Sequence, residues 1–208
     1  GNSFLGSNPS PSATIILSNI IVNSLYAHLN WYLFPYSKEI FDQLWKKICI
    51  QIKDNEYQLS TTCYDNRNII SSLIENKHLG LGQICGLNLN KYESCTISYI
   101  GSFINDDSNT SAGFYKSLII TNKNNIDTSI ENLEAIINEK DSYSGRYALY
   151  HFFNKNYKSP NFRNEKYTGS HYETIKFIKS NKNSIGAIDY LSWNIISKYE
   201  PNLIENIK

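Results

Sequence analysis

The sequence lacks an excess of charge of either sign. Its 208 residues include 20 lysines and arginines against 19 aspartates and glutamates, which leaves a formal net charge of +1. A protein that binds nucleic acid through the phosphate backbone usually carries a basic patch or stripe. The near-neutral balance therefore argues against a nucleic-acid partner. It remains compatible with a small anionic ligand, because a buried anion site needs only local donors.

Cysteine is scarce, and the spacings of a metal site are missing. Cys49, Cys63, Cys85 and Cys95 form no C-x-x-C pair, and no histidine flanks them at zinc-site spacing. We therefore predict neither a metal nor a cofactor. An even number of cysteines permits disulfides in an oxidising compartment. Cys85 and Cys95 are the pair we expect to be bridged, and the alternative is four buried thiols.

A long hydrophobic run is also missing. The segment TIILSNIIVNSLYA, residues 14–27, is interrupted by serines and asparagines, so it is too short and too polar to span a bilayer. Together with the Gly/Ser/Pro-rich stretch before it, we interpret residues 1–24 as an N-terminal extension, either the tail of an export signal or an added element. No complete signal peptide is visible, and a mature exported protein would have lost one.

From residue 25 onward, strand-like segments alternate with segments of helical period. In residues 37–52, for example, Ile40, Phe41, Leu44, Trp45 and Ile48 fall on one helical face. We expect strands at 25–33, 57–64, 79–86, 95–103, 114–122, 135–138, 165–169 and 184–189, with helices at 37–52, 66–77, 128–134, within 141–153, 171–181 and 190–199. Such alternation predicts an α/β architecture with largely parallel sheets, as one domain or two small lobes.

Polar side chains gather at three predicted strand-to-helix junctions, residues 63–65, 141–145 and 168–171. In open α/β sheets, ligands bind beyond the carboxyl ends of the strands, where helix N-termini offer unpaired N–H groups and partial positive charge. Each junction alone is explained as well by an N-cap, and Ser170 with Glu173 fits the S-x-x-E capping box. Together they favour a site for an anion, whose oxygens accept hydrogen bonds from hydroxyls and backbone N–H groups.

Several segments between residues 27 and 193 carry a family resemblance. They are AHLNWYLFPYSKEIFDQLW with its Tyr32, Pro35 and Asp42-x-Leu44-Trp45, then LGLGQICG, GFYKSLIIT, NEKDSYSG and TGSHYETIKFIKSNKNSIGAIDYLSW. The last two are the most specific, because their Ser-x-Ser-Gly and Gly-Ser-His motifs agree in spacing and order. The chain resembles the phosphate/phosphite/phosphonate-binding proteins of ABC transporters.

This resemblance implies a two-lobed α/β protein of the type II periplasmic-binding class, each lobe a mostly parallel sheet flanked by helices. Lobe one would comprise residues 25–114 and 189–208, and lobe two residues 115–188. Crossing segments near 114–116 and 188–190 would act as hinges, with the ligand between the lobes. The implied function is extracytoplasmic, in the periplasm. The protein would capture a small phosphate-, phosphite- or phosphonate-like oxyanion for the permease of an ABC importer, without catalysis. A lipid anchor would be its only link to a membrane.

The resemblance also implies specific ligand contacts. The hydroxyls of Ser142 and Ser144 and the backbone of Tyr143 would hold the oxyanion, and Gly145 would let it approach the backbone closely. The further contacts it implies are His171, Tyr32, Tyr64, Gln83 and Asp189, the last facing the far end of the ligand. From the residues alone, the histidine and the aspartate are explained equally well as helix caps.

Two other functions compete with this one. Ser144, His171 and Asp189 contain the letters of a hydrolase triad, but G-x-S-x-G is missing and the histidine precedes the aspartate, against the α/β-hydrolase order. We therefore expect no enzyme. The second alternative keeps the fold and changes the ligand. Tyr32, Tyr64 and Tyr143 could stack on an organic molecule such as a thiamine-type pyrimidine precursor, in a carrier or a sensor.

Overall fold

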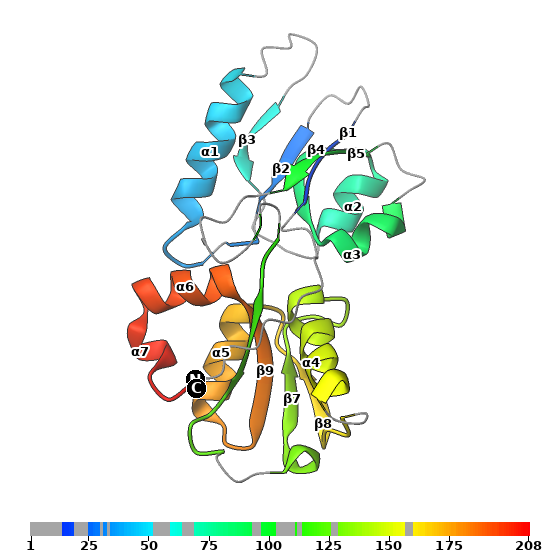
Figure 1. Cartoon of the computed structure of the whole chain (residues 1–208). Helices are drawn as coiled ribbons and strands as arrows, with labels where there is room; N and C mark the ends of the chain where they lie inside the picture. Colours follow the sequence, from blue (N-terminus) through cyan, green and yellow to red (C-terminus); the bar gives the residue numbers. More distant parts are fainter. Residues whose placement is uncertain are drawn as a thin grey trace. The chain divides into compact units, whose positions relative to one another are not determined.

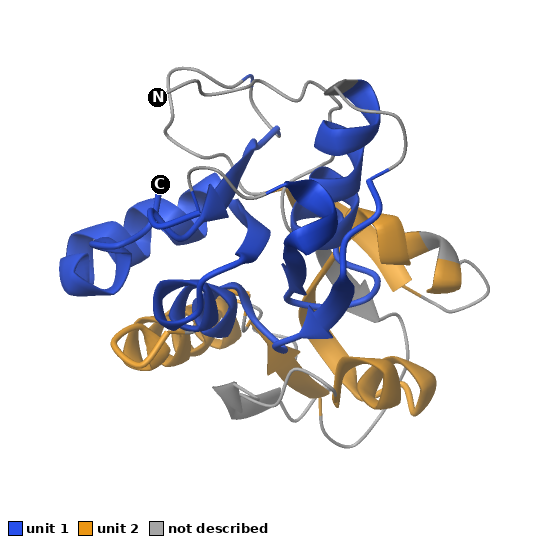
Figure 2. Ribbon diagram, turned by 90° about the horizontal axis from the view of Figure 1, so that it is seen from below, with its two compact units in different colours: residues 1–10, 105–208 blue, residues 11–104 orange. Residues whose placement is uncertain are grey.

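The chain folds into two compact units, which Figure 2 distinguishes by colour. One comprises residues 11–104 and the other residues 1–10 and 105–208. The computed structural model describes residues 14–18, 25–29, 31–32, 34–51, 59–63, 69–92, 97–102, 111, 114–125, 129–156 and 160–208. Each unit is built on its own sheet, and each is described here by itself.

The unit of residues 11–104 holds a five-stranded sheet in the order β3-β2-β4-β1-β5. Its strands are β1 (Thr14–Ser18), β2 (Leu25–His28), β3 (Leu59–Cys63), β4 (Leu79–Ile84) and β5 (Ile97–Ser102). β2 pairs in parallel with β3 and β4, whereas β1 lies antiparallel between β4 and β5. Part of the segment that we interpreted as an N-terminal extension is thus an internal strand. Because β1 is antiparallel to both of its neighbours, this sheet is mixed, whereas we expected it to be largely parallel.

Helices pack on this sheet through two separate apolar clusters. α1 (Lys38–Gln51) inserts the fully buried Trp45 beside Ala27 and Leu81. The shorter helical elements are α2 (Ile70–Glu75), α3 (Gly86–Leu89) and η2 (Asn90–Tyr92). Buried residues of α2 form a second cluster with residues of β4. The predicted inward face of α1 is correct at Trp45, but Ile40 is 63% exposed and Leu44 is 37% exposed. The apolar arc of the helix is wider than the strip that contacts the sheet.

The second unit holds a four-stranded sheet in the order β6-β9-β7-β8 (Figure 1). Its strands are β6 (Ser117–Thr121), β7 (Glu134–Ile137), β8 (Asn164–Tyr167) and β9 (Ser184–Asp189). Its helical segments are η3 (Ile130–Asn132), η4 (Tyr143–Tyr147), α4 (Ala148–Asn156), α5 (His171–Ser180), α6 (Tyr190–Tyr199) and α7 (Pro201–Ile204). β7 pairs in parallel with both β8 and β9, and β6 is antiparallel to β9.

Helices flank both faces of this second sheet. Leu149 and Phe153 of α4 pack in one cluster with Ala187 of β9. A Cβ on the next strand residue, Gly186, would lie 3.0 Å from Ile178 of α5. Because successive strand residues point to opposite faces of a sheet, α4 and α5 cover opposite faces of this one. Their positions in Figure 1 agree with this. The predicted α/β arrangement, with parallel strand pairs flanked by helices, is confirmed.

The C-terminal residues belong to this second unit, whereas the prediction grouped residues 189–208 with the N-terminal lobe. Thr121 and Lys208 exchange two backbone hydrogen bonds of 3.0 Å, and the Lys123 amide donates to the Asn206 carbonyl at 2.9 Å. These bonds attach the end of the chain to β6. The predicted and observed boundaries differ because backbone hydrogen bonds to β6 place the last residues in this unit. No side-chain pattern in the sequence indicates such bonds.

The two predicted crossing segments lie side by side in this unit. Ser117 at the start of β6 pairs with Asp189 at the end of β9. One step further, the Tyr190 amide donates to the Lys116 carbonyl at 2.9 Å, and the Lys116 ammonium lies 4.1 Å from the centre of the Tyr190 ring. Their role as hinges stays a prediction.

Two remaining expectations concern the membrane and the disulfide. Among the described segments, no helix is both long and apolar enough to cross a bilayer. Cys95 lies outside the described residues, so its pairing with Cys85 also stays a prediction.

Candidate functional site

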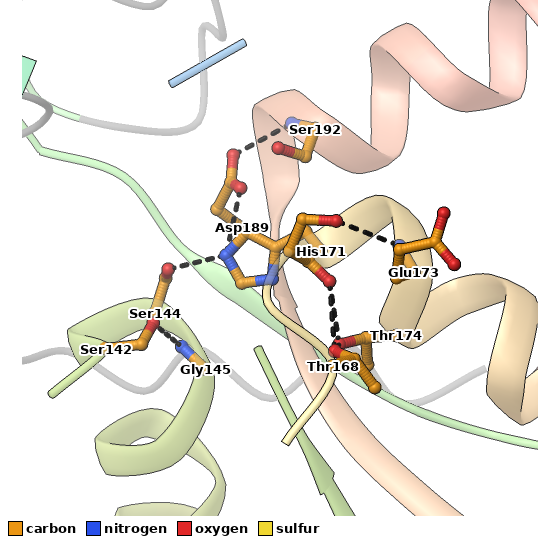
Figure 3. A network of polar contacts seen from close by, with 10 residues as sticks. Ser142, Ser144, Gly145, Thr168, His171, Glu173, Thr174, Asp189 and Ser192 are labelled. Atoms are coloured by element: carbon orange, nitrogen blue, oxygen red, sulfur yellow. Dashed lines mark hydrogen bonds and ion pairs between the residues drawn. The ribbon is translucent and has the colours of Figure 1, made fainter. Parts of the chain in front are cut away.

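Three helical segments begin at one edge of the second sheet. η4 follows β7, α5 follows β8 and α6 follows β9. Because these strands are parallel, their carboxyl ends share that edge, which is where ligands bind in open α/β sheets. Figure 3 shows the polar side chains of the three helix starts meeting there.

The first helix start is a π turn capped by Ser142. The Ser142 hydroxyl oxygen accepts from the Gly145 amide at 3.0 Å, and its carbonyl accepts from the Tyr147 amide at 3.1 Å. A bond across five residues is the spacing of a π turn, which is rare and frequent at functional sites. The amides of residues 143, 144 and 146 also precede that bond, so the turn begins with a group of N–H donors and with two buried hydroxyls, those of Ser142 and Ser144.

Gly145 has a different neighbour from the one the sequence suggested. A Cβ at this position would lie 1.9 Å from Oδ1 of Asn138 and 3.0 Å from Oγ of Ser142. The space that we assigned to a closely approaching ligand is therefore occupied by Asn138, the residue that follows β7. Asn138 is buried, and its Oδ1 has no hydrogen-bond donor among the described residues. Sequence reasoning missed it, although an asparagine directly after an apolar strand was a usable signal.

The second helix start follows a glycine turn. Gly169 has a φ of +84°, in the left-handed region that favours glycine, and its amide donates to the Asn138 carbonyl at 2.7 Å. The Ser170 hydroxyl accepts from the Glu173 amide at 3.1 Å, so the predicted N-cap is present. The Glu173 carboxylate pairs instead with Lys176 at 2.9 Å, which leaves the serine as the capping partner.

His171 connects the three helix starts. Its Nε2 lies 2.8 Å from Oγ of Ser144 and 3.3 Å from Oδ2 of Asp189. The other carboxylate oxygen of Asp189, Oδ1, accepts from the Ser192 amide at 2.8 Å and so caps α6. The histidine and aspartate side chains are only 12% and 8% exposed. Three residues predicted from the sequence thus form one nearly buried polar cluster.

The contacts of this cluster differ from those of a hydrolase triad. In a triad, the serine and the aspartate contact opposite nitrogens of the ring, so the imidazole can take a proton from one side while it is held from the other. Here Ser144 and Asp189 both contact Nε2 of His171. Asp189 therefore does not make the contact with the opposite ring nitrogen that the aspartate of a triad makes.

The cationic side chain nearest in sequence to this cluster is directed elsewhere. Arg146 contacts Glu165 Oε1 through both Nε at 3.2 Å and a terminal nitrogen at 3.1 Å. This ion pair raises the pKa of Arg146 further. The contacts of the cluster itself are made by hydroxyls, backbone amides, one imidazole and one carboxylate. No group of three or more metal-ligating side chains occurs in the part of the chain that the structure describes.

The other predicted contacts are placed as follows. Tyr143 lies in η4, and its ring stacks on Tyr147 with centroids 6.2 Å apart. Tyr32 and Gln83 belong to the other unit. The Gln83 Oε1 accepts from the Trp31 amide at 3.1 Å, while its buried Nε2 finds no acceptor among the described residues. Tyr64 lies outside the described residues. Ligand contacts by all of these residues stay predictions.

The fold is similar to that of PhnD1 from Prochlorococcus marinus (MIT 9301), solved in complex with methylphosphonate. The TM-score is 0.62 and the identity 21%, over 90% of this chain and 71% of that chain. At this identity the likeness concerns the fold alone, and it supports the phosphonate-binding-like fold that the sequence resemblance implied. No family model and no curated protein matches the chain.

Proposed function

We propose that the chain is a solute-binding protein of the type II periplasmic class that captures a small tetrahedral oxyanion of the phosphate, phosphite or phosphonate kind. It would act outside the cytoplasm and deliver its ligand to the permease of an ABC importer. The observation that carries the proposal is the convergence of Ser142, Ser144 and His171 at helix starts along one sheet edge. The methylphosphonate complex of PhnD1, a protein of similar fold, supports this ligand class.

The donors at this edge suit an oxyanion. Unprotonated anionic oxygens only accept hydrogen bonds, and the edge supplies the hydroxyls of Ser142 and Ser144 and the first amides of η4 as donors. Each hydrogen bond to a charged group contributes about 1.5–3 kcal/mol, and a helix N-terminus adds about 0.3–1 kcal/mol. A few such bonds suffice for micromolar binding, which corresponds to about −8 kcal/mol, after the costs of association.

A catalytic role has less support. The hydrolase alternative needs the ring of His171 to relay a proton between Ser144 and Asp189, and both of these side chains contact the same nitrogen. The protein of similar fold was solved with a bound ligand rather than described as an enzyme. Binding without chemistry is the simpler use of this cluster.

A thermal-shift screen tests the proposal. Methylphosphonate, phosphate and phosphite are titrated against the full chain, with chloride at matched ionic strength as the control. A ligand that binds only the folded state adds about 2.7 kcal/mol of stability at a hundredfold excess over its Kd, so one of these anions should raise Tm in a saturable way. Including a thiamine-type pyrimidine tests the organic-ligand alternative. If none of the three anions raises Tm beyond the chloride control, the oxyanion proposal is wrong.

A further inference from the structure

Nε2 of His171 faces two oxygen atoms at once, which restricts where the ring hydrogen can be. Oγ of Ser144 lies 2.8 Å from it and Oδ2 of Asp189 lies 3.3 Å from it (Figure 3). A ring nitrogen presents either one hydrogen or one lone pair, and an ionised carboxylate only accepts. A lone pair on Nε2 would face the carboxylate oxygen, acceptor against acceptor. The negative charge of Asp189 therefore holds a hydrogen on Nε2.

That hydrogen decides the direction of the bond to Ser144. With Nε2 as the donor, Oγ of Ser144 accepts, and the hydroxyl hydrogen of Ser144 is directed away from the ring. With Nε2 as a lone pair, the same hydroxyl would donate to the ring instead. The two protonation states of Nε2 leave the distance between Nε2 and Oγ of Ser144 the same. They differ in whether the Ser144 hydroxyl has its hydrogen available to donate to a ligand.

Asp189 is itself held firmly. Its Oδ1 accepts from the Ser192 amide at 2.8 Å at the start of α6, and the residue is only 6% exposed. The cap fixes one oxygen on the helix and leaves the other beside His171. A carboxylate near an anion site would otherwise repel the ligand, but here both of its oxygens face donors of the protein.

We infer that Asp189 is a positioning residue that does not itself contact the ligand. Through His171, it sets Ser144 to donate its hydroxyl hydrogen to an unprotonated anionic oxygen. The inference rests on the proposed function for the identity of that acceptor. It differs from the role that the family resemblance implied for Asp189, namely a direct contact at the far end of the ligand.

The variant Asp189→Asn tests the inference without removing the helix cap. Asparagine is as good an N-cap as aspartate, so its Oδ1 can still accept from Ser192 while its NH₂ group faces Nε2. A facing donor favours the lone pair on Nε2. Nitrogen NMR of the ligand-free, ¹⁵N-histidine-labelled chain should then show Nε2 of His171 protonated in the parent and unprotonated in the variant. His171→Gln identifies the signals. An unchanged protonation of Nε2 would overturn the inference.

Binding supplies the second readout, with methylphosphonate as the probe. Removing a negative charge beside an anion should tighten binding if the charge acts directly. Our inference predicts the opposite: Asp189→Asn binds about 10- to 100-fold more weakly, as expected for one lost charge-assisted hydrogen bond. The double variant with Ser144→Ala should bind no more weakly than the weaker single variant. Tighter binding by Asp189→Asn, or losses that add in full, would contradict the inference.

Glu200→Gln is the matched control. Glu200 lies at the other end of α6 and accepts from the Tyr172 hydroxyl at 2.9 Å, so the change removes the same charge without altering the contacts of Nε2. It should leave both the ring signals and the affinity as in the parent, and an equal shift in this control would count against Asp189. If the parent itself binds none of the anions tested, the proposed function fails, while the NMR comparison still decides whether Asp189 sets the ring.

Discussion

At the scale of single residues, the polar cluster around His171 lies beside a close contact between Asn138 and Gly145. Oδ1 of Asn138 fills the space in which Gly145 would carry a Cβ. Asn138 also accepts from the Gly169 amide through its carbonyl. One buried asparagine thus contacts two of the three helix starts, and its side chain fills the space beside Gly145.

Gly145→Ala should therefore destabilise the fold. An alanine in a helix is ordinarily about 1 kcal/mol more favourable than glycine, but here its methyl group would displace Asn138, and overpacking costs about 1–3 kcal/mol. Urea unfolding measures the change. Gly101→Ala is the control, because a Cβ there meets nothing within 4 Å. If Gly145→Ala were as stable as the parent, Asn138 would have to move without cost.

Ser144→Ala should weaken binding of methylphosphonate or phosphate by about 1–3 kcal/mol, the contribution of one hydrogen bond to a charged partner. Calorimetry of the variant measures the loss, and urea unfolding should show little change in stability. Ser197→Ala is the control, since that hydroxyl donates to the Trp193 carbonyl of its own helix. An unchanged affinity in Ser144→Ala would remove this serine from the site.

At the scale of elements, one carboxylate, that of Glu165, connects the edge strand β8 to η4 and α4. Glu165 of β8 accepts hydrogen bonds from Arg146, Tyr150 and Tyr167. Burial by itself would raise the pKa of Glu165, but the hydrogen bonds from the two tyrosines and the arginine outweigh it and lower that pKa. Burial and the bond to Glu165 raise the pKa of Tyr150 to about 12.

The lowered pKa of Glu165 predicts a pH dependence of stability. A carboxyl whose folded pKa lies below its unfolded value of about 4.3 stabilises the fold above that pH. The contribution is lost as the pH falls through the folded pKa. Glu165→Gln should thus lower the free energy of unfolding at pH 7 by about 1 kcal/mol or less, since solvent screens a partly exposed pair. It should also flatten the decline in acid.

Urea unfolding between neutral pH and pH 3 would measure this difference. Glu173→Gln removes the same charge from an exposed i,i+3 pair with Lys176 and should leave the acid decline in place. Parallel acid profiles for the parent and Glu165→Gln would contradict the role assigned to this carboxylate.

The order of most elements could be predicted from the sequence, because their apolar periods and turn residues are local signals. β9 and α6, for example, begin and end where predicted, at Ser184–Asp189 and Tyr190–Tyr199. β1 could not be predicted, since a five-residue apolar run reads equally well as part of an export signal. Its place in the sheet depends on pairing with distant strands. α7, with four residues, is too short to show a period.

The positions of the candidate site residues were predictable to a similar degree, while their contacts with a ligand stay predictions. Ser142, Ser144, His171 and Asp189 stand at junctions that the alternation of strands and helices identifies, and the structure brings their helix starts to one edge. Two contacts were beyond sequence reasoning. One is that Asn138, whose place after a strand was visible in the sequence, packs against Gly145. The other is that Ser144 and Asp189 share one nitrogen, because distances between residues far apart in the chain are set only by packing.

At the scale of the whole molecule, one unit contains a continuous stretch of chain with its own sheet and core. Residues 105–208 hold all four strands of β6-β9-β7-β8 and the helices that cover both faces. A segment of about 100 residues is within the size range of autonomous domains.

Expressed alone, residues 105–208 should give a cooperative thermal transition and an α/β circular dichroism spectrum. Residues 105–205, which keep β9, α6 and α7 but lack the pairing of Thr121 with Lys208, are the matched truncation and should be less stable. A non-cooperative transition for 105–208 would show that this unit needs the rest of the chain.

The internal position of β1 has a kinetic consequence. β1 precedes β4 and β5 in the chain by tens of residues, yet it lies between them and pairs with both. Long-range pairing of this kind raises contact order and slows folding. Until β1 is inserted, β4 and β5 each present an open main-chain edge, and such edges promote aggregation during folding. The unit of residues 11–104 should consequently refold more slowly than the other unit after dilution from denaturant, and its yield should depend on protein concentration.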